Sequence, residues 1–359
     1  IKELKEILSD ENKIYEIIKN ETLEVMEKYG DERRTEIIQQ AEQIITNEDL
    51  INEEDIVITL TNAGYIKQIP LETYKSQKRG GTGIRAAATK EDDVIDELFI
   101  TSNLNHLLFF TNKGKIHWLK AYQVPEASRY AKGMNVVNLL RLNNEEKVSA
   151  VLPMKSLNQD LNLIFATKKG LVKKTHLEEF SKPRQGGIQA ILLKENDEVV
   201  QVMLSTGDLG FIIGSKNGRA VKFNEKDVRV MGRTSQGVRG IKLHNDYVVG
   251  MELADENLDV LTVTENGFGK RTLMSEYRLI TRGGKGVRNI KVTEKNGPVI
   301  DIKSVKDSDE IMCITDKGQI IRMKVNEISK IGRNTQGVRV MRLRESDKVA
   351  KVCKVVESE

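Results

Sequence analysis

The chain has 359 residues, of which 39% are hydrophobic, 5% aromatic and 31% charged, and its formal net charge is +4. It holds no apolar run near the ~18 residues that a membrane-spanning helix needs, and no signal peptide is visible, which argues against a membrane protein. The two cysteines, Cys313 and Cys353, form no Cys-x-x-Cys pair and lie in apolar runs, which favours buried free thiols in a reducing cytoplasm.

The charge is distributed unevenly along the chain. Residues 1–54 contain 7 basic and 16 acidic residues, whereas the remainder contains 50 basic and 37 acidic residues. A basic body that follows an acidic arm points to a polyanionic partner for the basic part.

Residues 1–54 are predicted to form a helical arm and a linker. Apolar residues recur there at steps of three and four, which is the spacing of one helix face. Ser9 and Asp10 can cap a new helix, and Gly30 is a suitable C-terminal stop. Because the helical pattern already runs at Ile1, we expect the chain to be a fragment whose arm packs on a missing body.

Residues 55–356 carry a six-fold repeat of about fifty residues that is marked by glycines. The first series, each member preceded by one or two polar residues, consists of Gly64, Gly114, Gly170, Gly218, Gly267 and Gly318. The second series follows 19 residues later, or 17 in one unit, and consists of Gly83, Gly133, Gly187, Gly237, Gly286 and Gly337. A valine opens a further strand-like run in each unit, at Val94, Val148, Val199, Val248, Val299 and Val349. Three markers in phase over six units indicate a propeller-like array.

The residues around each first-series glycine favour strands. A β-rich run such as 260–263 precedes the glycine, and a shorter run with basic residues, such as 171–174, follows it. Two such runs around a polar loop that ends in glycine predict a β-hairpin. We therefore predict an all-β fold of six propeller-like blades, preceded by the α-helical arm.

The second glycine series carries the predicted chemistry. An arginine stands a few residues before each of these glycines, and four units add another arginine two residues after it. The symmetry of the array should bring these arginines to equivalent heights around its rim, where glycine-rich loops let peptide N–H groups and guanidinium groups approach phosphates. The predicted DNA-contacting residues are Lys78, Arg79, Arg85, Arg129, Lys132, Arg184, Arg233, Arg239, Arg282, Lys285, Arg288, Arg333 and Arg339. Since no base-reading element is evident, binding should depend on phosphate contacts and DNA deformability.

No self-contained active site is predicted. The histidines are scattered singly without metal-ligand spacing, and the pattern of a phosphate-binding P-loop is missing. We assign no catalytic residue and no metal ligand.

Two segments resemble the DNA gyrase A subunit family. The segment Gln77, Lys78, Arg79, Gly80, Gly81, Thr82 and Gly83 is similar to that family's seven-residue box, in the first repeat where the family carries it. Lys78 and Thr82 differ from the residues that the family usually has at these positions. Lys78 keeps the positive charge, whereas Thr82 loses one. Residues 27–35 are similar to the family's motif at the end of its long coiled coil. The resemblance covers essentially the whole chain.

The resemblance implies a six-bladed β-pinwheel at 55–356, whose blades exchange strands with their neighbours. It also implies that residues 1–54 are the end of the breakage-reunion and coiled-coil region. It implies that duplex DNA wraps around the basic rim with positive handedness and that the box joins the first blade to the last. It further implies a dimer of the A subunit, in partnership with the gyrase B subunit, within an ATP-dependent cytoplasmic type II topoisomerase that introduces negative supercoils.

The resemblance assigns no cofactor to this fragment, because ATP and Mg²⁺ act through the partner subunit. The catalytic tyrosine lies in the part of the family that is absent here, so no tyrosine of this chain is assigned as a nucleophile. The oligomeric state of the fragment stays open, with a monomer as one option.

Two alternatives are kept. The related topoisomerase IV subunit has a similar C-terminal domain but usually has fewer blades and lacks an intact box, whereas this chain has six repeats and a near-intact box. A propeller-type interaction scaffold would carry mixed charges and aromatic anchors in its loops, whereas only Tyr130 interrupts these basic loops.

Overall fold

The computed structural model describes residues 1–31, 35, 47–61, 63–71, 95–128, 131–143, 145–157, 159–182, 184, 186–317, 319–344 and 347–355. The chain divides into two compact units, Ile1–Ile51 and Asn52–Glu359. Within the described residues, no helix is long and apolar enough to cross a membrane.

The first unit contains the predicted helices. Helix α1 spans Lys2–Leu8 and α2 spans Glu11–Tyr29, followed by a short 3-10 helix, η1, at Asn47–Leu50. The Asp10 carboxylate accepts a hydrogen bond from Asn12 N at 3.0 Å, so Asp10 is the predicted N-cap. Neither α1 nor α2 has a buried residue.

The second unit contains six β-hairpins, as the repeat predicts. Their strands are β1 (Asp55–Thr61) and β2 (Tyr65–Pro70), β4 (His106–Thr111) and β5 (Lys115–Lys120), β8 (Asn162–Thr167) and β9 (Leu171–His176), β12 (Gly210–Ser215) and β13 (Arg219–Asn224), β16 (Asp259–Thr264) and β17 (Phe268–Leu273), and β20 (Glu310–Thr315) and β21 (Ile320–Lys324). The turn between β8 and β9 closes with Gly170 N donating to Thr167 O at 2.9 Å. Gly170 has a φ of +83°, a conformation that favours glycine.

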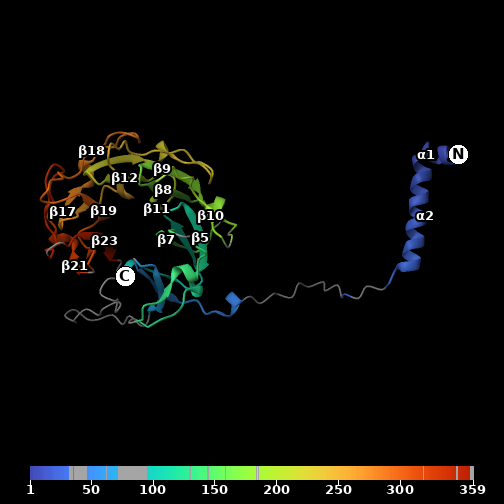
Figure 1. Cartoon of the computed structure of the whole chain (residues 1–359), viewed down its shortest axis with the longest axis horizontal. Coiled ribbons are helices and arrows are strands. Elements are labelled where there is room, and N and C mark those ends of the chain that lie inside the picture. The colour runs from blue at the N-terminus through green and yellow to red at the C-terminus, as the bar shows by residue number, and fades with distance from the viewer. Residues whose placement is uncertain are drawn as a thin grey trace. The chain divides into compact units, whose positions relative to one another are not determined.

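Each hairpin is extended on one side by a strand from its own unit. These strands are β3 (Ile95–Ser102), β7 (Val148–Met154), β11 (Val199–Ser205), β15 (Val248–Leu253), β19 (Val299–Val305) and β23 (Val349–Val355). From β7 to β23 each of them contacts the next, and β23 contacts β3. The blades therefore follow one another around a ring, with these strands on its inner side (Figure 1).

On the other side, five hairpins receive a two-residue strand from the following unit. These strands are β6 (Met134–Asn135), β10 (Ile188–Gln189), β14 (Val238–Arg239), β18 (Val287–Arg288) and β22 (Val338–Arg339). The third sheet, for example, has the order β11-β8-β9-β14. Among the described residues the sixth sheet has three strands, β21-β20-β23. The predicted six-bladed propeller is thereby confirmed, and five of its sheets take a strand from the following unit.

The apolar cores lie between neighbouring blades. One core cluster joins β4 and β5 to β8, with the rings of Phe110 and Phe165 packed edge to face at 5.7 Å. Of the two free thiols, Cys313 is buried and Cys353 is partly buried.

Candidate nucleic-acid interface

The second-series glycines bring the loop of each unit onto the preceding blade. At Gly237 the φ is +86°, and a Cβ atom would lie 2.5 Å from Val172 O, so only glycine fits. The strand that follows then pairs with the edge of the preceding hairpin, with Arg239 opposite Leu171. Arg288 and Arg339 occupy the same register position in the next two blades.

These short strands lie on the outer side of the ring, as the labels β10 and β18 show (Figure 1). The residues of the predicted set that are exposed there are Lys132, Arg184, Arg239, Lys285, Arg288 and Arg339. Arg233, Arg282 and Arg333 are half-buried at the same rim. The structure therefore brings the described members of the set to one edge of the molecule. The box, Gln77–Gly83, and the predicted contacts Lys78, Arg79, Arg85 and Arg129 lie outside the described residues.

Arginines of consecutive units touch one another along the rim. Arg282 donates from Nη1 to the carbonyl of Arg239 at 3.3 Å, and Arg333 donates from Nη1 to the carbonyl of Arg288 at 3.2 Å. Main-chain hydrogen bonds tie the same loops together, with Lys242 N donating to Gly284 O at 2.8 Å. Arginine side chains thus link the fourth unit to the fifth and the fifth to the sixth, and we call this cationic surface the rim belt (residues 232–342).

Two belt arginines lie near carboxylates. Arg233 Nε is 3.7 Å from Glu179 Oε2, and Arg333 Nε is 4.0 Å from Glu276 Oε2. In the described part of the chain, the exposed cations Arg239, Arg288 and Arg339 form no ion pair. Their charge is therefore available to an anion.

Sequence reasoning missed further cations of this rim. Lys242, Lys291 and Arg342 are exposed and stand five residues after the second-series glycines of the last three units. The fifty-residue period of the repeat would have identified these three residues. Arg219, also exposed, pairs with Arg288 across β13 and β18. A surface cavity of about 460 Å³ is lined there by Asn217, Arg219, Lys242, Leu243, His244, Asp246 and Lys285.

Other cations belong to the scaffold. Lys174 Nζ lies 3.5 Å from the buried Glu225 carboxylate, and Lys222 is paired with Glu256. Arg271 donates from Nε to Ile328 O at 2.8 Å and pairs with Asp259. These side chains tie each blade to the following one and do not face a ligand.

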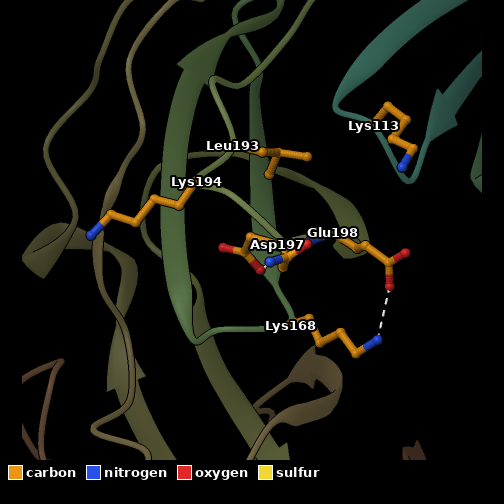
Figure 2. Close-up of a pocket in the computed structure, with 7 residues that line it drawn as sticks. Lys113, Lys168, Leu193, Lys194, Asp197 and Glu198 are labelled. Carbon is orange, nitrogen blue, oxygen red and sulfur yellow. Dashed lines mark hydrogen bonds and ion pairs between the residues drawn. The ribbon is translucent and has the colours of Figure 1, made fainter.

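A cavity of about 420 Å³ lies between the second and third blades (Figure 2). Lys113 reaches it from the second blade, and Lys168 donates to Glu198 at 2.9 Å within it. The hydrogen bond from Lys168 lowers the pKa of Glu198. Because carboxylates partly neutralise its lysines, this cavity is a weaker anion site than the rim belt.

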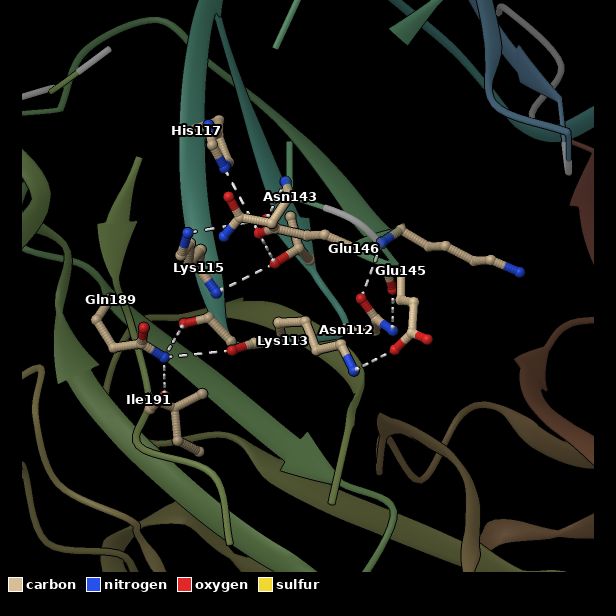
Figure 3. Close-up of polar contacts among 12 residues, drawn as sticks. Asn112, Lys113, Lys115, His117, Asn143, Glu145, Glu146, Gln189 and Ile191 are labelled. Carbon is tan, nitrogen blue, oxygen red and sulfur yellow. Dashed lines mark hydrogen bonds and ion pairs between the residues drawn. The ribbon is translucent and has the colours of Figure 1, made fainter. Parts of the chain in front are cut away.

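No catalytic constellation is present in the described residues. They contain no group of three or more histidine, cysteine or acidic residues that could hold a metal ion. His117 is buried in the second blade with Nε2 3.7 Å from Glu146 Oε1, and Lys115 approaches the same carboxylate (Figure 3). Burial lowers the pKa of His117, although Glu146 raises it. This network stabilises the blade rather than forming an open site.

The comparisons with known proteins agree with this geometry. The family model described as "DNA gyrase C-terminal domain, beta-propeller" matches residues 55–102, 105–153, 161–206, 211–255, 258–306 and 309–354. Proteins named as the A subunit of DNA gyrase are similar to this chain, with 51% identity in Clostridium acetobutylicum and 53% in Halalkalibacterium halodurans, over 99% of this chain and 43% of each relative. The chain thus spans less than half the length of these relatives.

Two solved structures are similar. One, titled "Structure of DNA gyrase A C-terminal domain", has a TM-score of 0.69 at 30% identity, with 84% of this chain and all of that chain covered. The other, the C-terminal domain of DNA topoisomerase IV, has a TM-score of 0.73 at 27% identity, with 85% of this chain and 94% of that chain covered.

Proposed function

This chain belongs to the DNA gyrase A subunit family, and on that premise we propose that its propeller binds duplex DNA along the rim belt and bends it. The observation that carries the proposal is the contact between arginines of consecutive units, because it makes the cationic surface continuous over three blades. A continuous line of phosphate ligands on a curved edge favours a bent duplex over a straight one.

Binding to duplex DNA should show little sequence preference and a steep dependence on salt. If six to ten phosphates are contacted, the affinity should fall by orders of magnitude between about 50 and 200 mM salt. The measurement is fluorescence anisotropy with two duplexes of unrelated sequence.

Arg233→Ala together with Arg239→Ala should weaken binding and lower the salt slope by about 1 for each phosphate that is no longer bound. The matched control is Lys13→Ala together with Lys19→Ala, which removes two positive charges from α2, outside the propeller. A salt slope that is unchanged in the Arg233, Arg239 variant would place those residues off the DNA path.

In the whole enzyme, we infer that this wrap has positive handedness and feeds a neighbouring DNA segment to strand passage, so that negative supercoils are introduced. The chemistry would then lie in the remainder of the A subunit, with ATP and Mg²⁺ acting through the B subunit, within a cytoplasmic complex built on a dimer of the A subunit. This propeller contributes DNA geometry and no reacting group.

We further propose that the box closes the ring of sheets. In five blades the residue two positions after the second-series glycine pairs with the residue that follows the first-series glycine, as Arg239 pairs with Leu171. The same register in the sixth blade would set Arg85 opposite Gln319. Replacing Gln77–Gly83 by alanines should abolish supercoiling in a reconstituted enzyme while sparing relaxation. Retention of full supercoiling would contradict this role.

The structural similarity to the topoisomerase IV domain supports a second candidate function, that of the topoisomerase IV subunit. That role would not require negative supercoiling. A reconstituted enzyme that relaxes DNA but never supercoils it, with the box intact, would favour the second candidate.

A further inference from the structure

One position in the second strand of the hairpins lies beneath a rim loop in the first five blades. It is the third residue after the first-series glycine, and in chain order it holds Lys67, His117, Lys173, Val221, Lys270 and Ile321. The lysines occupy every second blade. They are almost fully buried, at 3%, 0% and 0% exposure for Lys67, Lys173 and Lys270.

The buried ammonium groups bind carbonyl groups of the rim loops. Lys173 Nζ donates to Arg233 O and to Ala190 O, both at 2.5 Å. Lys270 Nζ donates to Gly332 O at 2.7 Å, and Lys67 Nζ donates to Ala131 O at 2.9 Å. Each lysine therefore holds, from below, the loop that the following unit contributes to the rim.

The loops differ according to what lies beneath them. Those above Lys173 and Lys270 have the form Gly-Arg-x-x-Gln-Gly, at 232–237 and 332–337. Those above His117 and Val221 contain paired glycines, at 186–187 and 283–284. A Cβ atom on Gly187 would lie 2.6 Å from the His117 ring, so that loop rests directly on the blade. Gly237 approaches its blade as closely, since its Cβ atom would lie 2.5 Å from Val172 O. Where the paired glycines are missing, a lysine therefore adds hydrogen bonds from below to this direct contact.

Where a loop carbonyl points inward, the N–H group of the same peptide points outward. Lys173 binds the carbonyl of the Arg233–Thr234 peptide, and in the described part of the chain no acceptor is present for Thr234 N–H. Lys270 binds the carbonyl of the Gly332–Arg333 peptide, whose N–H group donates to Glu276 Oε2 at 3.2 Å. Thr234 N–H can therefore donate to an anion beside Arg233, because peptide N–H groups at a loop surface bind anions.

We propose that Lys173 and Lys270 are positioning residues of the rim belt: each draws a carbonyl of its loop inward, so that Arg233 or Arg333 faces a DNA phosphate, joined in the first of these loops by Thr234 N–H. This inference rests on the proposed function. The inference adds to the proposed function the residues that shape two of the DNA-contacting loops.

The charge of these lysines should respond to DNA. Glu179 and Glu276, the acids nearest to them, pair with Arg233 and Arg333 instead. Burial lowers the pKa of Lys173 to about 7 and that of Lys270 to about 8, with the glutamate raising and the arginine lowering each value. An approaching phosphate favours the protonated form. DNA binding should therefore take up protons, and affinity should fall as the pH rises from about 7 to 9.

The experiment compares the parent chain with Lys173→Met plus Lys270→Met, using duplex anisotropy at fixed salt between pH 6.5 and 9. We expect affinity at pH 6.5 to fall by about fivefold for each lysine, with a flatter pH profile. Val221 occupies the same position in the fourth blade, so the fold accepts an apolar side chain there. If the methionine variant does not fold, Lys173→Arg plus Lys270→Arg replaces it, and should keep the affinity at pH 6.5 while flattening the profile.

The matched control is Lys174→Met, which removes the same charge from the adjacent residue but breaks the pair with Glu225. It should lower the melting temperature and leave the pH profile of binding unchanged. Parental affinity and pH profile in the double methionine variant would overturn the positioning role. Failure of the parent chain to bind duplex at all would instead overturn the proposed function.

Discussion

Cations occupy three kinds of position in the propeller, and each kind has a different consequence. Arg239 is exposed at the rim, Lys174 is buried against a carboxylate, and Lys173 is buried against carbonyls. Lys173 and Lys174 are neighbours on β9 whose side chains point to opposite faces of the sheet. Formal charge therefore overstates what a polyanion can reach, because only the first kind presents its full charge to solvent.

The buried lysines predict a pH dependence of stability. Their pKa values, about 7 and about 8, lie below the ordinary 10.5, so the folded chain binds fewer protons than the unfolded chain between these limits. The free energy of unfolding should therefore rise with pH over that range. Lys173→Met plus Lys270→Met removes this contribution. In urea titrations at pH 7 and 9.5, the parent should gain stability relative to the variant.

An equal change in parent and variant would show that these lysines keep their ordinary pKa in the folded chain. The Lys13→Ala variant serves as the control, since Lys13 is an exposed residue of α2 outside the propeller. Its pH dependence should follow that of the parent.

Single residues also show what could and could not be predicted from the sequence. The period of fifty residues found the rim arginines, because a repeated fold places repeated residues alike. The same reasoning treated Lys173 as one of several cations in a strand. Its burial results from the loop of the next unit lying over it, a contact that strand alternation within one unit does not encode.

At the scale of elements, the hairpins could be predicted and the strand exchange could not. Glycines at fixed spacing between two β-rich runs identify a hairpin. The rim strands have two residues each and pair with a different unit, so neither length nor alternation marks them. The resemblance to the gyrase A family supplied the exchange, and the sheet orders confirm it for five blades.

Gly237→Ala tests the junction between a rim loop and the preceding blade. The new Cβ atom would lie 2.5 Å from Val172 O, at a φ of +86°. We expect a loss of about 1–3 kcal/mol in the free energy of unfolding, measured by urea titration. Gly232→Ala in the same loop is the control, because nothing lies within 4 Å of its Cβ position. Equal stability of the two variants would contradict the account of the junction.

The proposed register of the sixth blade can be tested by a disulfide. Arg85→Cys with Gln319→Cys should cross-link under mild oxidation, since directly opposed antiparallel residues have Cα atoms about 4.5–5.5 Å apart. Arg85→Cys with Arg322→Cys, three residues along the chain, should not. Cross-linking is read from the electrophoretic mobility of the sample after proteolysis. If only the pair at 85 and 322 cross-links, the register of the sixth blade differs from the proposed one.

At the scale of the molecule, the ring sets the curvature of the cationic surface. From β7 to β23 each inner strand contacts the next, and β23 contacts β3, so the rim loops are held on a curved frame. The described cations concentrate in the last three units, from Arg233 to Arg342. We expect this arc to bind DNA most strongly, because its arginines are in mutual contact.

The most direct test of the central claim is to close nicked circular DNA with ligase in the presence of increasing amounts of the chain. Bending of the duplex around the rim with positive handedness predicts a positive change in linking number that grows with the ratio of protein to DNA. The gel should show the same sign at every ratio below saturation. A linking number that stays unchanged while anisotropy reports bound DNA would contradict the account, because the belt would then hold DNA without wrapping it.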